Sequence, residues 1–323
     1  MNAHTPILKW ATDCLISKGY SLLPSPEILL ETPWSNIIRL PTSQYDVYLK
    51  QMPPAISLDP QIIQLLMHQC HASVPVVIAI NEELHCFLMK DAGQNLRAYL
   101  KKTEFQPDLL CQAIREFTTI QRSTENHIQS FLALGVPDWR LDKFPKLYDH
   151  IINQAAFLKA DGVTDNELKI LQTLSIKVAE QCALLSKYQI PETLVQPDFN
   201  TNNILFNPNT KKMTLIDLGE IAITHPFFSL HNFLYQATIH HNVKEGDKTY
   251  DQLQNVCFEN WLELALQSQL LRGFEVAKKL LPIYTAFGCY RLMMSVDLQA
   301  FKSYCANKPN PLAESFRKYI TSV

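Results

Sequence analysis

The chain has 323 residues, of which 47% are hydrophobic and 19% charged, so it has ample material for a sizeable core and is not disordered by composition. The length allows one large domain or two of ordinary size. A net charge of −2 provides no basic surface for nucleic acid or an anionic membrane. Apolar runs are far shorter than the roughly 20 residues of a membrane span, and we expect no secretory signal, hence a cytoplasmic protein.

Glycine and cysteine are informative because of what their positions exclude. Only eight glycines occur among 323 residues, against an average usage of roughly 7%, and no two are spaced as G-x-G. The dinucleotide fingerprint G-x-G-x-x-G and the Walker A loop are therefore excluded, and any phosphate site must use other groups. The eight cysteines include no C-x-x-C pair, which excludes a zinc ribbon and a thioredoxin motif.

The first 90 residues contain short apolar runs separated by turn residues. After an amphipathic helix over about 6–18, the pattern predicts strands at 36–40, 46–52, 76–80 and 85–89. The first two strands form a hairpin, and in the second Val47 and Leu49 alternate with Tyr48 and Lys50. A helix is expected to open at 59–60, with an aspartate as its N-cap and a proline in its first turn.

From residue 95 the apolar periodicity is helical. Helices are predicted over about 107–133, 145–158, 165–188, 227–241, 249–269, 273–303 and 311–321. The segment 193–223 interrupts them with two short strands, 203–206 and 213–217, joined by a turn. We therefore expect an α+β protein. A sheet-rich N-terminal lobe would cover 1–91, and a large helical lobe carrying one hairpin would cover 92–323.

Polar side chains gather around this hairpin. Asp198 and Asn203 are five residues apart in one loop, and Asp217 ends the second strand, so the turn brings it back toward Asn203. A carboxylate with an amide oxygen suits Mg²⁺, which is usually held by one or two carboxylates plus substrate phosphates. The other carboxylate could accept a proton from a hydroxyl group. Either aspartate alone would be an ordinary turn or capping residue.

The order Asp198, four residues, Asn203, hairpin, Asp217 before a glycine is that of protein-kinase-like phosphotransferases. The sequence resembles the aminoglycoside phosphotransferase/choline kinase family in particular, whose pattern is His-Gly-Asp-x-x-x-x-Asn-Ile-Leu followed by Ile-Asp-[Phe/Trp]-Gly. The matching positions are Asp198, Asn203, Ile204, Leu205, Ile216, Asp217 and Gly219. Segments 32–50, 87–93, 135–138 and 225–230 are also similar to members, so the resemblance covers nearly the whole chain.

The resemblance implies a two-lobed kinase-like fold and ATP–Mg²⁺-dependent phosphorylation of a hydroxyl on a small-molecule acceptor. Carried over residue by residue, Lys50 holds the nucleotide phosphates. Asp198 orients or deprotonates the acceptor hydroxyl, while Asn203 and Asp217 bind Mg²⁺.

The remaining implied positions surround the nucleotide. Ser35 and Asn36 would lie in the loop that covers the phosphates, without a glycine. Met89 and Asp91 would border the adenine at the hinge between the lobes. Asp59 is the nearest candidate for the small-lobe carboxylate that pairs with the phosphate lysine in this family.

The main departure from the family pattern is Gln196-Pro197, where members have His-Gly. Glutamine can donate and accept hydrogen bonds, but proline fixes φ and removes a backbone donor one residue before Asp198. A catalytically impaired pseudokinase therefore stays open as the alternative function. A protein kinase is set aside, because no Ala-Pro-Glu segment or long activation loop follows Asp217.

Two histidines, at 68 and 71, invite a zinc site, but no second cluster with ligand spacing accompanies them, so we do not assign one. The region 224–323 has 10 Lys+Arg and 8 Asp+Glu, a net charge of +2, which disfavours a polycationic aminoglycoside as acceptor. The acceptor, the choice between ATP and GTP, and the oligomeric state are left open.

Overall fold

A five-stranded antiparallel sheet forms the N-terminal part of the computed structural model, which describes residues 5–307 and 310–323. The strand order is β1-β2-β3-β5-β4. The strands are β1 (Glu27–Glu31), β2 (Asn36–Leu40), β3 (Val47–Gln51), β4 (Val77–Asn81) and β5 (Cys86–Lys90). Four of them agree with the sequence-based prediction to within two residues. The alternation in β3 also holds, because Val47 and Leu49 are fully buried.

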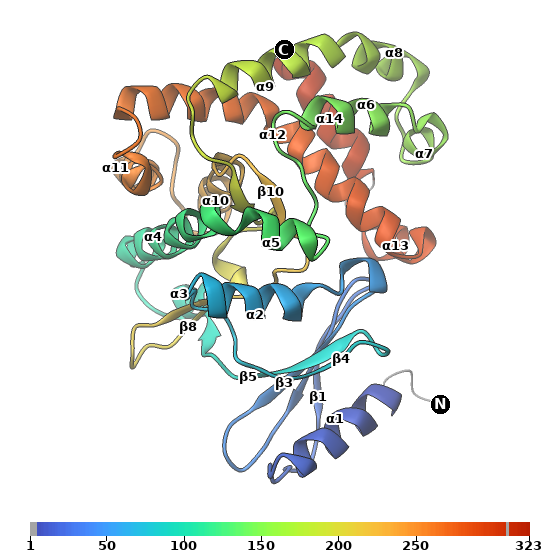
Figure 1. The fold of residues 1–323 in the computed structure, drawn as a ribbon, viewed down its shortest axis with the longest axis vertical. Coiled ribbons are helices and arrows are strands. Elements are labelled where there is room, and N and C mark those ends of the chain that lie inside the picture. The colour runs from blue at the N-terminus through green and yellow to red at the C-terminus, as the bar shows by residue number, and fades with distance from the viewer. Residues whose placement is uncertain (1–4, 308–309) are drawn as a thin grey trace.

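Helices cover both faces of this sheet (Figure 1). On the outer face, α1 (Thr5–Ser17) packs Ile7, Ala11 and Leu15 against Leu49 and neighbouring strand residues. On the other face, α2 (Asp59–Gln69) lies between the sheet and the helical lobe (Figure 1). Lys50 is buried on the α2 side, opposite Val47 and Leu49 in the pleat.

Two features of the small lobe differ from the sequence-based expectation. Strand β1 was not predicted, because all five of its residues are exposed and show no apolar–polar alternation. Asp59 was expected to be the N-cap of α2. Instead Leu58 occupies that position without a side-chain cap, and Asp59 is the first residue of the helix. Its carboxylate is buried and binds other groups, as described below.

The C-terminal part is mainly helical. Its helices are α3 (Leu96–Lys102), α4 (Pro107–Thr124), α5 (Ile128–Ala133), α6 (Phe144–Ile152), α7 (Ala155–Ala160), α8 (Asp165–Thr173), α9 (Ser175–Ser186), α10 (Phe227–His240), α11 (Lys248–Val256), α12 (Gln267–Ser295), α13 (Leu298–Tyr304) and α14 (Pro311–Ser322). Five stretches predicted as single helices are each interrupted, namely 107–133, 145–158, 165–188, 249–269 and 273–303. None of the helices described is both long and apolar enough to cross a membrane.

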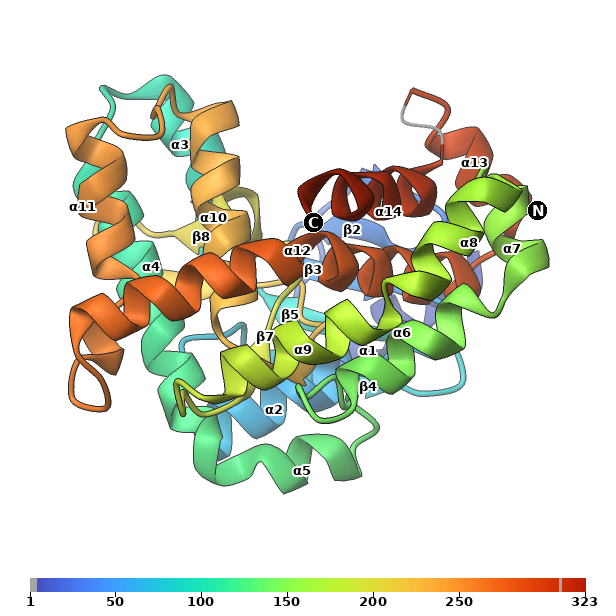
Figure 2. The same cartoon turned by 90° about the horizontal axis from the view of Figure 1, so that it is seen from above.

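The longest helix corrects a predicted break. A boundary was expected between 269 and 273, yet α12 runs without interruption from Gln267 to Ser295, across Gly273 and Pro282. A Cβ atom on Gly273 would lie 3.3 Å from the Tyr188 ring, so this glycine permits close packing and does not end the helix. Figure 2 shows α12 crossing the lobe beside α9 and α14.

Short strands inside the helical part position the polar loop. Strand β7 (Thr193–Val195) pairs with β10 (Ala222–Thr224), and β8 (Ile204–Phe206) pairs with both β6 (Gln94–Asn95) and β9 (Met213–Leu215). The β8–β9 hairpin was predicted, whereas β6, β7 and β10 were not. A small antiparallel sheet with a large helical part confirms the α+β class and the kinase-like architecture.

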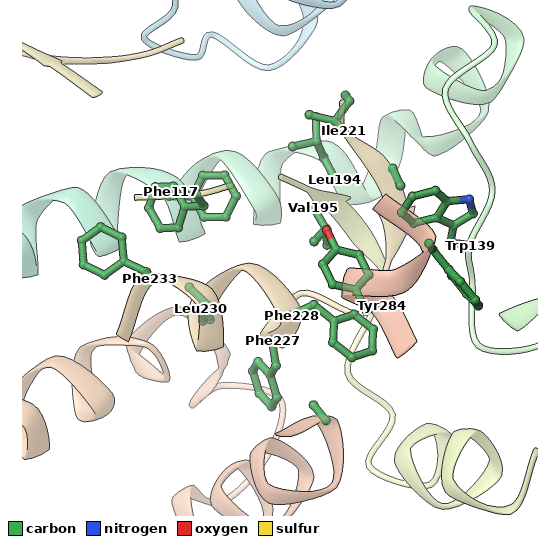
Figure 3. Close-up of a cluster of buried hydrophobic side chains, with 14 of the residues drawn as sticks. Phe117, Trp139, Leu194, Val195, Ile221, Phe227, Phe228, Leu230, Phe233 and Tyr284 are labelled. Atoms are coloured by element: carbon green, nitrogen blue, oxygen red, sulfur yellow. The ribbon is translucent and has the colours of Figure 1, made fainter. Parts of the chain in front are cut away.

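Buried aromatic side chains, among them Phe117, Phe228 and Phe233, form a cluster inside the helical part (Figure 3). Phe199, the residue after Asp198, is fully buried and stacks between Phe117 at 3.8 Å and Phe233 at 4.8 Å, measured between ring centroids. Farther along the same core, Phe228 stacks on Tyr284 at 4.7 Å. Because the Phe199 ring is held in this core, it restrains the backbone of the adjacent residue Asp198.

Candidate active site

Asp198 lies in the loop between β7 and β8, and its side chain is exposed. Asn200 Nδ2 donates to Asp198 Oδ1 at 2.7 Å, and Asn203 Nδ2 donates to Asp198 Oδ2 at 3.0 Å. The surrounding protein atoms partly desolvate the carboxylate, and together with the negative charge of Asp217 this raises the pKa of Asp198 to about 6. The loop therefore presents an oriented carboxylate close to a second one.

The β8–β9 hairpin brings Asn203 and Asp217 together. Ile204 pairs with Leu215, and the backbone N of Ile216 donates to the Asn203 carbonyl oxygen at 3.0 Å. Asp217 has φ +62, a left-handed conformation that aspartate tolerates better than most residues. Its side chain is 44% exposed, so part of the carboxylate is accessible to a ligand.

Lys50 reaches this carboxylate from the small lobe. Its Nζ lies 2.5 Å from Asp59 Oδ2 and 2.7 Å from Asp217 Oδ1, with only 5% of the side chain exposed. Burial alone would lower the pKa of the Lys50 ammonium, but the charges of Asp217 and Asp59 raise it well above its ordinary value. The ammonium group is therefore held in its charged form between two carboxylates.

Asp59 links three segments of the chain. One oxygen binds Lys50 of β3, and the other, Oδ1, accepts a hydrogen bond from the backbone N of Leu218 at 3.1 Å. The segment after Asp217 also runs very close to the helical turn η1 (Pro54–Ile56). A Cβ atom on Gly219 would lie 2.8 Å from the Ile56 carbonyl oxygen, so this position requires glycine.

Gln196 ties the Asp198 loop to the backbone beside Asp217. Its Nε2 donates to the carbonyl oxygens of Ile216 at 2.9 Å and Asp217 at 2.7 Å. Its backbone is fixed by Ser229, whose hydroxyl accepts from the Gln196 N at 2.8 Å and donates to the Gln196 carbonyl at 2.7 Å. The residue that departs from the expected histidine thus connects the two segments that carry the carboxylates.

The loop between β1 and β2 carries Ser35, whereas Asn36, expected in the same loop, is the first residue of β2. Thr32 orders this turn, because its hydroxyl accepts from the Ser35 N at 2.8 Å and donates to the Ser35 carbonyl at 3.0 Å. Trp34 packs against two rings of α13, those of Phe301 and Tyr304. Within the described ranges, Ser35 Oγ and Asn36 Oδ1 are buried without a hydrogen-bond partner.

Asn36 lies beside Lys50 in the sheet. It pairs with Gln51, the residue after Lys50, and its Nδ2 donates to the Gln51 Oε1 at 3.3 Å. Met89 is on β5, the other neighbour of β3, and pairs with Tyr48.

Asp91 follows β5 at the junction between the two parts of the chain. Its backbone N donates to the Asp46 carbonyl at 3.1 Å, and its Oδ1 accepts from the Gly93 N at 3.1 Å. Met89 therefore lies on the strand next to Lys50, and Asp91 lies just after this strand. Their contact with an adenine ring stays a prediction.

The oxygen atoms around Asp217 fit the chemistry of Mg²⁺. Asn203 Nδ2 faces Asp198, which turns the amide oxygen away from that carboxylate, and Asp217 Oδ2 is the oxygen not bonded to Lys50. Across 5–307 and 310–323, no three His, Cys, Asp or Glu side chains gather as a metal site. A cation here would therefore be held by one carboxylate, one amide oxygen and the phosphates of a substrate, an arrangement typical of Mg²⁺.

Sequence reasoning did not identify three further polar residues near these carboxylates. Glu220 follows Gly219, and its pKa is raised to about 7 by burial and by the charge of Asp217. Arg291 of α12 donates to the carbonyl oxygens of Gly219 and Ile221 at 3.1 and 3.0 Å. Arg97 of α3 donates to Asn200, two residues after Asp198, at 2.7 Å. The partners of the two arginines lie far away in the sequence, so spacing gave no signal.

Comparison with known proteins identifies the fold by structure alone. No protein-family model matches the sequence, and no curated protein matches it. Solved structures superpose over nearly the whole chain. Plasmodium vivax ethanolamine kinase has a TM-score of 0.63 at 14% identity, with 94% of this chain and 85% of that chain covered. Choline kinase LicA from Streptococcus pneumoniae has a TM-score of 0.60 at 10% identity, covering 98% of this chain and 99% of that chain.

A gentamicin complex of the aminoglycoside phosphotransferase APH(2")-IIa has a TM-score of 0.60 at 16% identity, covering 98% of this chain and 99% of that chain. The chain therefore has the fold of small-molecule phosphotransferases, as the motif resemblance predicted. At these identities the likeness concerns the fold only.

Proposed function

We propose that this protein is an ATP–Mg²⁺-dependent phosphotransferase that phosphorylates a hydroxyl group of a small-molecule acceptor. The observation that supports it most strongly is that hydrogen bonds join Lys50 to Asp217 and Asn203 to Asp198. The two aspartates are also near enough for the charge of Asp217 to raise the pKa of Asp198. These groups come from β3, the loop after β7 and the end of the β8–β9 hairpin. These four are the residues that the motif resemblance selects for phosphoryl transfer. Structural neighbours with this fold include an ATP complex of an aminoglycoside phosphotransferase and two alcohol kinases.

Each side chain has a role that follows from its contacts. Lys50 is a buried cation that would exchange its bond to the accessible Asp217 for nucleotide phosphate oxygens, while Asp59 keeps it in place. Asn203 and Asp217 would hold Mg²⁺, which neutralises the charge on the transferred phosphoryl group when bound. Asp198 would orient the acceptor hydroxyl and accept its proton.

The contacts of Gln196 favour an enzyme over a pseudokinase. The concern was that Gln196-Pro197 would disconnect the loop or turn Asp198 aside. Gln196 makes two hydrogen bonds to the backbone at Asp217, and the Asp198 carboxylate is exposed near the Asp217 charge. Both features support a competent loop in spite of Pro197.

Calorimetric titration of ATP with and without Mg²⁺ tests the nucleotide part of this proposal. We expect Mg²⁺ to strengthen ATP binding in the wild type and in Asp198→Asn, because Asp198 is not a metal ligand in this scheme. The metal-dependent part should vanish in Asp217→Ala. Binding that is absent, or that is indifferent to Mg²⁺ in the wild type, would refute the proposed function.

A further inference from the structure

Asn200 lies at the centre of a saturated hydrogen-bond network next to Asp198. It is 2% exposed. Its Nδ2 donates to the Asp198 Oδ1 at 2.7 Å and to the Asp198 carbonyl at 2.8 Å. Its Oδ1 accepts from the Asn202 N and from Arg97 Nη2, both at 2.7 Å. Because two neighbours only accept and two only donate, these contacts fix the orientation of the amide group.

The contact between Arg97 and this amide is unusual for a half-buried arginine. Charged side chains taken out of water are normally paired with an opposite charge. In the part of the chain that the structure describes, however, no carboxylate lies at ion-pair distance from Arg97. The shortest hydrogen bond of its guanidinium goes to the neutral Asn200 oxygen, with a longer one of 3.4 Å to the Thr201 hydroxyl. Arg97 is therefore hydrogen-bonded to the loop mainly through Asn200, and its charge also acts on the nearby Asp198 carboxylate, whose pKa it lowers.

Helix α3 holds Arg97 at a fixed place relative to that loop. Asn95, the N-cap of α3, accepts a hydrogen bond from the Ala98 N at 3.0 Å with its side-chain oxygen. The amide nitrogen of the same side chain donates to the Asn202 carbonyl at 2.6 Å. Asn95 also pairs with Leu205 in the ladder between β6 and β8. The helix and the loop thus form one rigid unit.

The two oxygens of Asp198 are held by two different amides. Oδ2 accepts from Asn203, which has a second task as a metal ligand in the proposed function, and Oδ1 accepts from Asn200. Two hydrogen bonds to two oxygens fix the plane of a carboxylate. Asn200 is the member of this pair that has no metal-binding role in the proposed function, and it is also the one that is bound to a cation.

We infer that Arg97 is a positioning residue for Asp198 and acts through the Asn200 amide. This inference rests on the proposed function. In the transfer step, the bond between the γ-phosphorus and the bridging oxygen breaks, ADP leaves with its electron pair, and the acceptor oxygen bonds to phosphorus. The acceptor proton passes to Asp198. Arg97 polarises and anchors Asn200, which holds Asp198 Oδ1 so that the carboxylate faces the acceptor oxygen.

Turnover of Mg·ATP with water as the acceptor tests this role without knowledge of the natural acceptor. We expect Arg97→Met to lower kcat for hydrolysis about 10- to 100-fold, the effect of losing one charge-assisted contact that orients a reacting group. The KM for Mg·ATP should stay within about twofold, because Arg97 does not contact the phosphate lysine or the metal ligands. Arg97→Lys, which keeps a cationic donor, should recover part of the loss.

A matched control is Arg115→Met. Arg115 lies on α4 and binds both oxygens of Glu259, at 2.7 and 3.0 Å, so this change removes one positive charge and one pair of hydrogen bonds elsewhere. We expect its kcat to equal that of the wild type. If Arg97→Met also turns over at the wild-type rate while the wild type binds Mg·ATP, the positioning role is wrong and the proposed function stands.

A double-mutant cycle separates a relay from two independent contacts. If Arg97 acts through Asn200, Arg97→Met should cost little further kcat in an Asn200→Ser background. Equal losses in both backgrounds would show that Arg97 acts by another route, which overturns the inference. Thermal unfolding of each variant identifies any loss of rate that comes from incomplete folding.

A spectroscopic measurement reports on the same contact if hydrolysis by water is too slow to detect. Both protons of the Asn200 side-chain amide are in hydrogen bonds, so we expect slow exchange with solvent in protein labelled with nitrogen-15 at asparagine. Asn200→Ser assigns the resonance by its loss. Arg97→Met should speed this exchange at least about tenfold, and Arg115→Met should not. Exchange that is unchanged in Arg97→Met would refute the coupling of Arg97 to Asn200.

Discussion

The ion pair between Lys50 and Asp59 is expected to stabilise the fold as well as the site. Asp59→Ala removes two interactions. The first is the ion pair with the buried Lys50 ammonium, 2.5 Å away, and the second is the hydrogen bond from the backbone N–H of the fully buried Leu218. Breaking a buried pair costs about 3–5 kcal/mol. The low end of this range applies here, because Lys50 still has Asp217 as an ion-pair partner. The Leu218 N–H, left buried without an acceptor, adds about 1–3 kcal/mol to the loss. The expected loss is therefore about 4–6 kcal/mol of unfolding free energy.

Asp59→Asn separates the two contributions. Asparagine keeps an acceptor for the Leu218 N–H but removes the charge opposite Lys50, so the expected loss falls to about 3 kcal/mol, the share of the broken pair. Asp46→Asn is a control, because its partner Arg39 is exposed, and such surface pairs contribute less than about 1 kcal/mol. The raised pKa of Lys50 means that its contribution is complete at neutral pH and declines only as pH rises above about 10.4.

Urea unfolding at pH 7, followed by circular dichroism and tryptophan fluorescence, measures these losses. The order of stability should be wild type, Asp46→Asn, Asp59→Asn and then Asp59→Ala. If Asp59→Ala costs no more than Asp46→Asn, then the buried pair does not stabilise the protein and the reasoning is wrong.

Three further changes have expected outcomes from the same structure. Gly93→Ala should cost well over 1 kcal/mol in urea unfolding, roughly the cost of a forced left-handed residue plus a clash, because φ is +124 and the new Cβ would lie 2.7 Å from a backbone oxygen. Gly246→Ala, with φ +86 and open space, should cost about 1–2 kcal/mol. Gln196→Ala should cost about 1–3 kcal/mol through its two lost backbone hydrogen bonds. Burial lowers the pKa of His225 and of His231 to about 3. The unfolded chain takes up these protons below about pH 6.5 and the folded protein does not, so each histidine should lower stability by up to about 2 kcal/mol by pH 5. Asp198 and Glu220 act in the opposite direction, because their raised pKa values make the folded protein take up protons in the same range. The stability of His231→Gln should therefore fall less between pH 7 and 5 than that of the wild type, by about this amount, and equal profiles would contradict burial of a neutral ring.

The architecture was predictable where apolar periodicity carries the signal. In strand β3, the buried apolar residues Val47 and Leu49 alternate with residues of the opposite face, which carries Lys50. The polar residues around the β8–β9 hairpin have the spacing of the family pattern. Strand β1 gave no such signal because it is an exposed edge. The helix break expected before Gly273 does not exist, because this glycine serves the contact with Tyr188. Apolar periodicity predicts which residues are buried, but it does not predict where a small residue is needed because two segments pack closely.

The site itself was predictable only in part. The residues proposed for phosphates, metal and proton transfer could be chosen from order and spacing along the chain. The partners that orient them could not. Gln196 was noted as a departure, but its two bonds to the Asp217 backbone depend on tertiary structure. No sequence motif pointed to Arg97, because its partner Asn200 is 103 positions away in the sequence.

The central claim is phosphoryl transfer to a small-molecule hydroxyl, and phosphorus NMR of the reaction products tests it most directly. Wild-type protein with Mg·ATP and a panel of hydroxyl-bearing metabolites should form one phosphomonoester in step with ADP. Asp198→Asn should bind Mg·ATP as the wild type does but turn over about 10²–10⁴ times more slowly. Wild-type protein that binds Mg·ATP and forms no phosphomonoester with any acceptor of the panel would contradict the claim and indicate a pseudokinase.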